Sequence, residues 1–162
     1  MAENEQIDRE TVAFTLNGKP AKAEVEPRAL LSDVLRDHFR LDGMHVGCEH
    51  GVCGACTILL DGEPVRSCLM FAAQADGHEV VTIEALGTPE KLDPLQEAFW
   101  KEHGFQCGYC TPGMVLTAKA FLAREPHPTR ESIRDALSGN LCRCTGYQFI
   151  VDAVLKASGQ QA

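Results

Sequence analysis

The sequence predicts an α+β fold in two parts, a small sheet domain followed by a bundle of four helices. Three observations support this prediction. Strand-like segments joined by tight turns end near residue 84, helix-start signals dominate after residue 92, and the eight cysteines divide evenly between the two parts. A chain of 162 residues accommodates one or two small domains. We therefore expect a first domain over residues 1–84, a linker over 85–92 and a helical domain over 93–162.

The first part contains two hairpin signals. Asn17-Gly18 and Asp61-Gly62 each separate two strand-like segments, and such dipeptides favour the type I′ turn of a tight hairpin. Apolar residues recur at helical spacing after Pro27, which predicts a short helix packed on one face of the sheet. The expected strands cover residues 11–16, 19–25, 57–60, 63–68 and 79–84.

The second part carries helix caps at regular intervals. Asp93 precedes Pro94, and Thr129 precedes another amphipathic segment, so both are expected to cap helices. Thr111-Pro112 predicts a further start, and Thr145 with Gln148 has the spacing of a capping box. The expected helices cover residues 94–101, 112–124, 130–137 and 146–157.

The first four cysteines have a specific spacing. Cys48, Cys53 and Cys56 are separated by four and then two residues, and Cys68 follows at a distance. This is the plant-type ferredoxin arrangement for a [2Fe–2S] cluster. Glycines interleave with these cysteines, and they let a loop wrap closely around an inorganic core and direct amide N–H groups at its sulfurs.

The second group has a less specific spacing. Cys107, Cys110, Cys142 and Cys144 could bind zinc, act as a redox dithiol or hold a cluster. Each pair directly precedes a helix-start signal, so we expect both pairs at helix N-termini. Free N–H groups and the positive end of the helix dipole favour a negative ligand there, and a thiolate-ligated cluster is such a ligand.

Composition excludes several other classes. The formal net charge is −8 and the isoelectric point is near 5.2, with no basic stripe, so nucleic-acid binding is disfavoured. Residues 1–6 lack the features of an export signal, and no run reaches membrane-spanning length, so we predict a soluble, cytoplasmic protein. In that reducing compartment, cysteines serve as metal ligands more often than as disulfides. His45 and His50 flank the first group, but four cysteines leave no need for a histidine ligand.

Three segments carry a resemblance to a known family. Residues 47–56 (GCEHGVCGAC), 106–114 (QCGYCTPGM) and 139–147 (GNLCRCTGY) look like signatures of the xanthine oxidase family. In particular, the chain resembles the separate small iron–sulfur subunit of bacterial molybdenum hydroxylases over about residues 11–157. The resemblance implies a plant-type ferredoxin-like (β-grasp) domain followed by a helical [2Fe–2S] domain.

The resemblance also implies partners and a direction of electron flow. A large subunit would hold a molybdenum–pterin cofactor and a medium subunit would hold FAD, in a dimer of heterotrimers. The cluster on Cys107, Cys110, Cys142 and Cys144 would lie nearest the molybdenum, and the cluster on the first four cysteines would face the flavin. Gln106 and Cys144 would contact the pterin. This chain would pass electrons one at a time and contain no substrate-transforming site.

Two alternatives stay open. A free-standing two-cluster ferredoxin would explain the first domain but would leave the helical domain and Gln106 without a role. A zinc-stabilised interaction module would use the same cysteines without redox chemistry. A red-brown protein containing iron, with two distinct EPR signals on reduction, would distinguish the predicted function from the zinc module. The sequence identifies neither the substrate nor the final electron acceptor.

Overall fold

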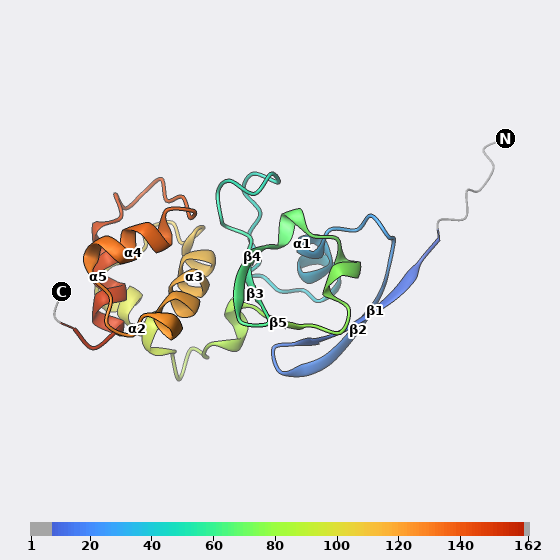
Figure 1. The fold of residues 1–162 in the computed structure, drawn as a ribbon, viewed down its shortest axis with the longest axis horizontal. Coiled ribbons are helices and arrows are strands. Elements are labelled where there is room, and N and C mark those ends of the chain that lie inside the picture. The colour runs from blue at the N-terminus through green and yellow to red at the C-terminus, as the bar shows by residue number, and fades with distance from the viewer. Residues whose placement is uncertain (1–7, 161–162) are drawn as a thin grey trace.

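A computed structural model describes residues 8–160, and in it the sheet part and the helical part lie side by side (Figure 1). The expectation about residues 1–6 falls outside the described residues. No helix within residues 8–160 has the length and apolar character needed to cross a membrane.

Five strands form one mixed sheet in the order β2-β1-β5-β3-β4. β1 pairs with β5 in parallel, and the other neighbours are antiparallel. Both predicted type I′ turns are confirmed by positive φ at the two central residues, 52° and 76° at Asn17 and Gly18 and 50° and 85° at Asp61 and Gly62. The strands are β1 Glu10–Leu16, β2 Lys19–Val25, β3 Thr57–Leu60, β4 Glu63–Arg66 and β5 Glu79–Val81.

Two strands are shorter than predicted. β4 ends at Arg66, and Cys68 lies in the 3₁₀ turn Ser67–Leu69 that follows it. β5 ends at Val81, because the N–H of Thr82 donates to the side chain of Asn17 (2.8 Å) instead of to the backbone of a neighbouring strand. Another 3₁₀ turn, Ile83–Ala85, then leads toward the helices.

The helix expected after Pro27 covers one face of the sheet. α1 (Leu31–Asp33) continues directly into the π-helical segment Val34–His38, so the helix is short and unusually wound. Leu31 and Leu35 are fully buried, and they belong to the same apolar core as strand residues from β1, β3 and β5. The core of the first part therefore lies between this helix and the sheet.

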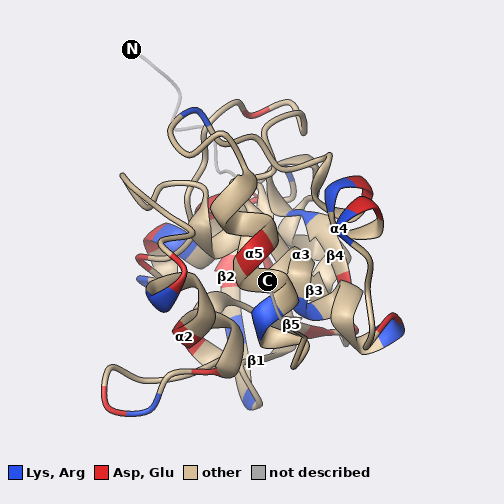
Figure 2. Cartoon of the chain, turned by 90° about the vertical axis from the view of Figure 1, so that its left-hand side faces the viewer, with Lys and Arg blue, Asp and Glu red and all other residues tan. Residues whose placement is uncertain are grey.

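Four helices form the second part, as predicted. They are α2 Pro94–Lys101, α3 Thr111–Arg124, α4 Arg130–Leu137 and α5 Gln148–Ala157. The Asp93 carboxylate accepts from the N–H of Leu95, and the Thr129 hydroxyl accepts from the N–H of Ser132, so both predicted caps are confirmed. Charges of both signs lie close together on α4 (Figure 2).

Two other predicted helix starts are wrong in detail. Cys110 occupies the cap position of α3, so Thr111 is the first helical residue instead of the cap. α5 begins at Gln148 behind Tyr147, whose φ is 69°, and the predicted capping box of Thr145 with Gln148 does not form. The Thr145 hydroxyl accepts instead from the N–H of Tyr147 (3.1 Å), because the left-handed residue turns the chain away from a regular cap.

The two parts meet along an apolar seam. Leu59 of β3 packs against Leu116 and Ala120 of α3, and all three side chains are buried. Above this seam in Figure 1, the loop of residues 47–56 and the loop before α5 lie on the same side of the molecule. The seam therefore places both cysteine-bearing regions on one edge, while the division at residues 85–92 stays a prediction.

Candidate metal centres

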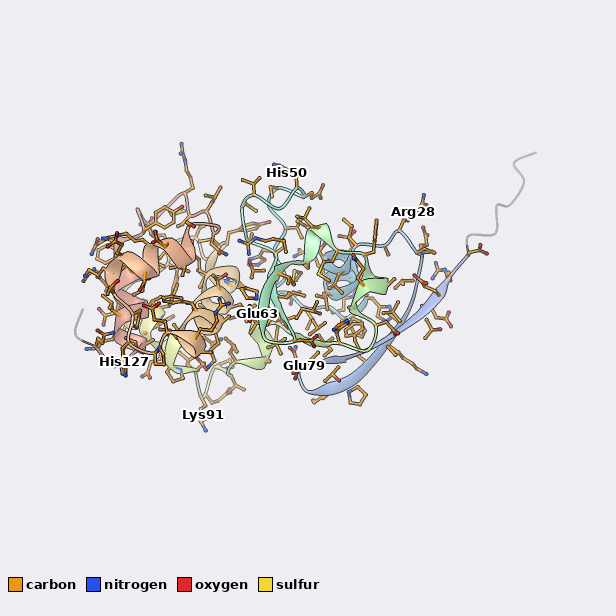
Figure 3. The ribbon with its side chains drawn as sticks, in the orientation of Figure 1. Arg28, His50, Glu63, Glu79, Lys91 and His127 are labelled. Carbon is orange, nitrogen blue, oxygen red and sulfur yellow. The ribbon has the colours of Figure 1, made fainter. Side chains whose placement is uncertain are left out.

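The first cysteine group combines an exposed loop with a buried base. The loop of residues 47–56 extends from the sheet, and His50 lies near its outer end (Figure 3). Cys48 and Cys53 are partly exposed on this loop. Cys56 and Cys68, by contrast, are only 1% and 3% exposed and form part of the sheet core. The structure thus brings together all four cysteines that the sequence assigned to this site.

The loop turns its backbone amides toward the outer thiols. Gly51 and Gly54 have φ of 80° and 73°, values that only glycine adopts without strain. The N–H of Cys53 donates to Cys48 Sγ at 3.4 Å. The backbone N–H groups of Cys53 and His50 lower the pKa of the Cys48 thiol to about 6. The loop therefore stabilises negative charge on sulfur, as the sequence predicted.

At the buried base of the site, the surroundings of Cys68 disfavour negative charge on sulfur. Burial, together with the neighbouring Cys56 side chain, raises the pKa of the Cys68 thiol to about 11. A thiolate at this position is costly unless a positive charge compensates for it. Bound iron would supply that charge, and its binding would release the thiol protons.

The second cysteine group lies at the surface of the helical part. Cys107 and Cys144 are exposed, with their Sγ atoms 3.5 Å apart, although they come from segments 37 residues apart. Cys110 and Cys142 lie beneath them and are partly buried. Burial raises the pKa of the Cys110 thiol to about 12, whereas the N–H of Tyr109 lowers that of Cys107.

Only one of the two predicted helix ends touches this site directly. Cys110 is at the cap of α3, as expected, but α5 begins four residues after Cys144. Two hydroxyl groups support the second pair instead. Cys142 Sγ lies 3.1 Å from the Thr145 hydroxyl, and the Tyr147 hydroxyl accepts from the N–H of Cys142 at 2.8 Å. The sequence placed Thr145 in a helix cap and so missed this role.

The thiols of each site are grouped two by two, which fits a two-iron core. Cys107 neighbours Cys144, and contacts between thiol side chains also link Cys110 to Cys142. In the first site the corresponding neighbours are Cys48 with Cys53 and Cys56 with Cys68. Within residues 8–160, no three His, Cys, Asp or Glu side chains converge on one single-ion position. A [2Fe–2S] cluster with four cysteine ligands needs two thiolates on each iron, which is the grouping observed.

The two flanking histidines contact backbone carbonyls. His45 Nδ1 lies 2.8 Å from the carbonyl oxygen of Tyr109, and its ring stacks on the Tyr109 ring with 4.7 Å between centroids. His50 Nδ1 contacts the carbonyl of Cys48 within the loop. His45 therefore joins the first cysteine loop to the second, a contact that the sequence did not predict.

Gln106, which the resemblance links to the pterin, is exposed. Gln106 precedes the exposed Cys107, which in turn neighbours Cys144. These three residues form one accessible edge of the second site.

A buried polar residue between the two sites was missed altogether. Asn140 is only 2% exposed and hydrogen-bonds to both parts of the molecule. Its only sequence signal is its place two residues before Cys142 in the segment GNLCRC.

Comparison with known proteins agrees with this architecture. A family model described as "2Fe-2S iron-sulfur cluster binding domain" matches residues 14–82, and one described as "[2Fe-2S] binding domain" matches residues 82–155. The gamma subunit of caffeine dehydrogenase from Pseudomonas sp. (strain CBB1) is 53% identical over 150 residues, covering 91% of this chain and 90% of that subunit. The small subunit of nicotine 6-hydroxylase from Paenarthrobacter nicotinovorans is 53% identical over 153 residues, covering 94% and 92%.

The chain belongs to the small iron–sulfur subunits of the xanthine oxidase family of molybdenum hydroxylases. Its fold matches quinoline 2-oxidoreductase from Pseudomonas putida 86 with a TM-score of 0.90 and 50% identity over 93% of each chain. Aldehyde oxidoreductase from Desulfovibrio gigas matches with a TM-score of 0.89 and 46% identity, but this chain covers only 17% of it. The same iron–sulfur module is therefore a separate chain in some relatives and part of a much longer chain in another.

Membership in the xanthine oxidase family confirms three predictions. The fold is α+β, both halves are [2Fe–2S]-binding domains, and the chain is an electron-transfer subunit of an oxidoreductase. It also disfavours the zinc module, because both family models describe iron–sulfur domains.

Proposed function

We propose that this chain carries electrons one at a time from a molybdenum–pterin centre in a large subunit, through two [2Fe–2S] clusters, to FAD on a medium subunit. The observation that carries the proposal is the direct contact between the two cysteine sites. The N–H of Leu141, next to Cys142, donates to the carbonyl of Cys53 at 2.8 Å. Cys53, a proposed ligand of the first site, is thus hydrogen-bonded to the residue next to Cys142, a proposed ligand of the second site.

Each site would use four thiolates. When bound, a [2Fe–2S] cluster accepts and returns a single electron. The backbone N–H groups around Cys48 and the Thr145 hydroxyl beside Cys142 would hydrogen-bond the sulfurs and so tune the potentials. The proposed ligands are Cys48, Cys53, Cys56 and Cys68 for the first cluster, and Cys107, Cys110, Cys142 and Cys144 for the second.

The two sites differ in the partner that they would face. Gln106, Cys107 and Cys144 form an exposed edge that a large subunit could approach, so we assign this edge to the pterin. The Gln106 amide can both donate and accept hydrogen bonds, which suits a pterin ring. The loop around His50 would then be the end that faces the flavin subunit (Figure 3).

Exposed apolar side chains support the presence of partner chains. Large apolar residues gather around the cysteine segments, although surface positions of this kind are usually polar in a protein that works alone. A free-standing ferredoxin would leave these side chains in water. Six large exposed apolar side chains lie within five residues of a cysteine: Val52, Leu69, Phe71, Tyr109, Leu141 and Phe149.

For the assembly as a whole, we propose a dimer of heterotrimers in the cytoplasm.

The order of the sites is tested with Cys107→Ser in the assembled complex. This change removes a ligand of the second site only, so substrate should no longer reduce the flavin. Dithionite should still reduce the first cluster, as followed by EPR. Flavin reduction by substrate at the wild-type rate would show that the proposed order is wrong.

The role of Gln106 is tested with Gln106→Ala. Both clusters should assemble with normal iron content, because this residue is not a metal ligand. The complex should lose pterin cofactor on dialysis faster than the wild type does, since the amide contact is gone. Equal retention of the cofactor would remove Gln106 from the proposed pterin contact.

A further inference from the structure

The three residues before Cys142 all contact the ferredoxin part. The carbonyl of Gly139 accepts from Arg66 at 2.6 Å, the side chain of Asn140 donates to the carbonyl of Gly54 at 3.0 Å, and the N–H of Leu141 donates to the carbonyl of Cys53 at 2.8 Å. We propose that residues 139–141 form a clamp that sets the position of the second cysteine site relative to the first, with Asn140 as its central positioning residue.

The side chain of Asn140 forms hydrogen bonds with both parts of the molecule. Its Nδ2 donates across the seam to the carbonyl of Gly54 and, at 3.3 Å, to the hydroxyl of Thr57. Its Oδ1 accepts from the hydroxyl of Thr117 on α3 at 3.0 Å. A carboxamide offers a donor and an acceptor at once, which neither an ionised carboxylate nor an aliphatic side chain can do. Buried polar groups of this kind are costly unless fully paired, so they select one arrangement of their surroundings.

Arg66 forms the outer arm of the clamp. One guanidinium nitrogen donates to the carbonyl of Gly139, and another donates to the hydroxyl of Thr57, both at 2.6 Å. Thr57 therefore receives bonds from both Arg66 and Asn140 while its own hydroxyl donates to the carbonyl of Gly54 at 2.6 Å. The clamp is thus a connected hydrogen-bond network. It links the end of the first cysteine loop, where β3 begins, to residues 139 and 140 of the segment that precedes Cys142.

Two glycines let the backbones come close enough for these bonds. A Cβ atom at Gly54 would lie 2.5 Å from the carbonyl oxygen of Gly139, and one at Gly113 would lie 2.3 Å from the carbonyl oxygen of Gly54. No side chain fits between the segments at either point. The separation of the two cysteine sites is therefore fixed by direct backbone contact.

The consequence concerns the transfer of an electron between the sites, so it rests on the proposed function. The electronic coupling between two centres decays steeply with the gap between them. A segment that bonds to the ferredoxin part through three consecutive residues, two of them to the first cysteine loop, and that continues directly into a proposed ligand of the second site holds that gap constant. Asn140 is neither a ligand nor a carrier; it acts by holding the two loops together.

The test compares Asn140→Leu with Thr117→Val in the full chain. Asn140→Leu removes the bonds across the seam, whereas Thr117→Val removes only the bond within the helical part. Hydrogen exchange followed by mass spectrometry reports on the peptide containing Leu141, whose N–H is bonded to Cys53. We expect its exchange to accelerate about tenfold in Asn140→Leu, from the loss of paired buried groups, and to accelerate less in Thr117→Val, which unpairs Asn140 Oδ1 but leaves both bonds across the seam in place.

A magnetic readout tests the same claim on the iron-loaded chain. Dipolar coupling between two reduced clusters falls with the cube of their separation, so Asn140→Leu should weaken or broaden the splitting of the EPR signals at unchanged iron content. Should that variant fail to fold, Arg66→Met removes the outer arm of the clamp from a partly exposed position and should shift both readouts in the same direction. Exchange and splitting that match the wild type, or an equal change in Thr117→Val, would overturn the clamp.

Failure of the proposed function gives a different result. A chain that bound no iron would show no EPR signal in any variant. The exchange of the Leu141 peptide would still report whether residues 139–141 hold the two parts together.

Discussion

The two cysteine sites each contain four cysteines, but in different settings. In the first, Cys56 and Cys68 are part of the sheet core, and the outer pair sits on a glycine-rich loop. In the second, no cysteine is fully buried, and the exposed pair is assembled from segments far apart in the sequence. The first site is therefore coupled to the folding of its domain, whereas the second is attached to the edge of a helical domain that has its own core.

We propose that this difference in burial reflects different roles of the two sites within the complex. A site inside the sheet core has two ligands whose positions are fixed by β3 and the turn after β4. We propose that the second site, whose outer thiols are exposed, presents its edge to another chain. The clamp of residues 139–141 then supplies the rigidity that the second site does not obtain from burial.

The largest effect that separates the two sites is expected from serine substitution at a core ligand. Cys56→Ser should abolish the first cluster and lower the stability of the sheet domain, because it places a hydroxyl among apolar side chains. Cys107→Ser should abolish only the second cluster and leave both cores intact. Iron analysis together with thermal unfolding of the isolated chain measures both effects. Equal losses of stability in the two variants would contradict the assignment of one site to the core and the other to the surface.

A smaller effect is expected at the seam between the sites. Gly113→Ala should destabilise the chain by about 1–3 kcal/mol, because the added methyl group meets the backbone at Gly54 and cannot be accommodated without movement. Gly139→Ala is the matched control in the same seam, since its methyl group would meet only the flexible end of Arg66. That variant should lose less stability than Gly113→Ala, because displacing the Arg66 guanidinium weakens only the outer arm of the clamp. Urea unfolding of the two variants measures the difference, and a reversed ranking would disprove the close approach.

The smallest effect is expected away from both sites. Thr129→Ala removes the confirmed cap of α4 and should cost about 1 kcal/mol of stability. The EPR signals of both clusters should be unchanged, because α4 holds no cysteine. A shift in either signal would mean that the helical core and the second site are more tightly coupled than their burial indicates.

Local chemistry made much of this structure predictable. The Asn17-Gly18 turn and the caps at Asp93 and Thr129 each depend on residues close together in the sequence, and all appear as predicted. The start of α5 was missed because the left-handed conformation of Tyr147 overrides the local capping signal.

Asn140 was missed for a different reason. Its partners Gly54 and Thr57 lie 86 and 83 residues away along the chain, and no local pattern indicates such a contact. The same holds for His45, which stacks on Tyr109 of the other cysteine group. Sequence spacing predicted the metal ligands, whereas the residues that connect the two sites emerged only from the folded chain.

The most direct test of two unequal sites is a reductive titration of the purified chain followed by EPR, carried out on the wild type and on Cys107→Ser. The wild type should give two distinct rhombic signals that appear at different potentials. Cys107→Ser should retain one of them unchanged and lose half of the iron. A single signal from the wild type, the loss of both signals in the variant, or stoichiometric zinc in place of iron would contradict the account.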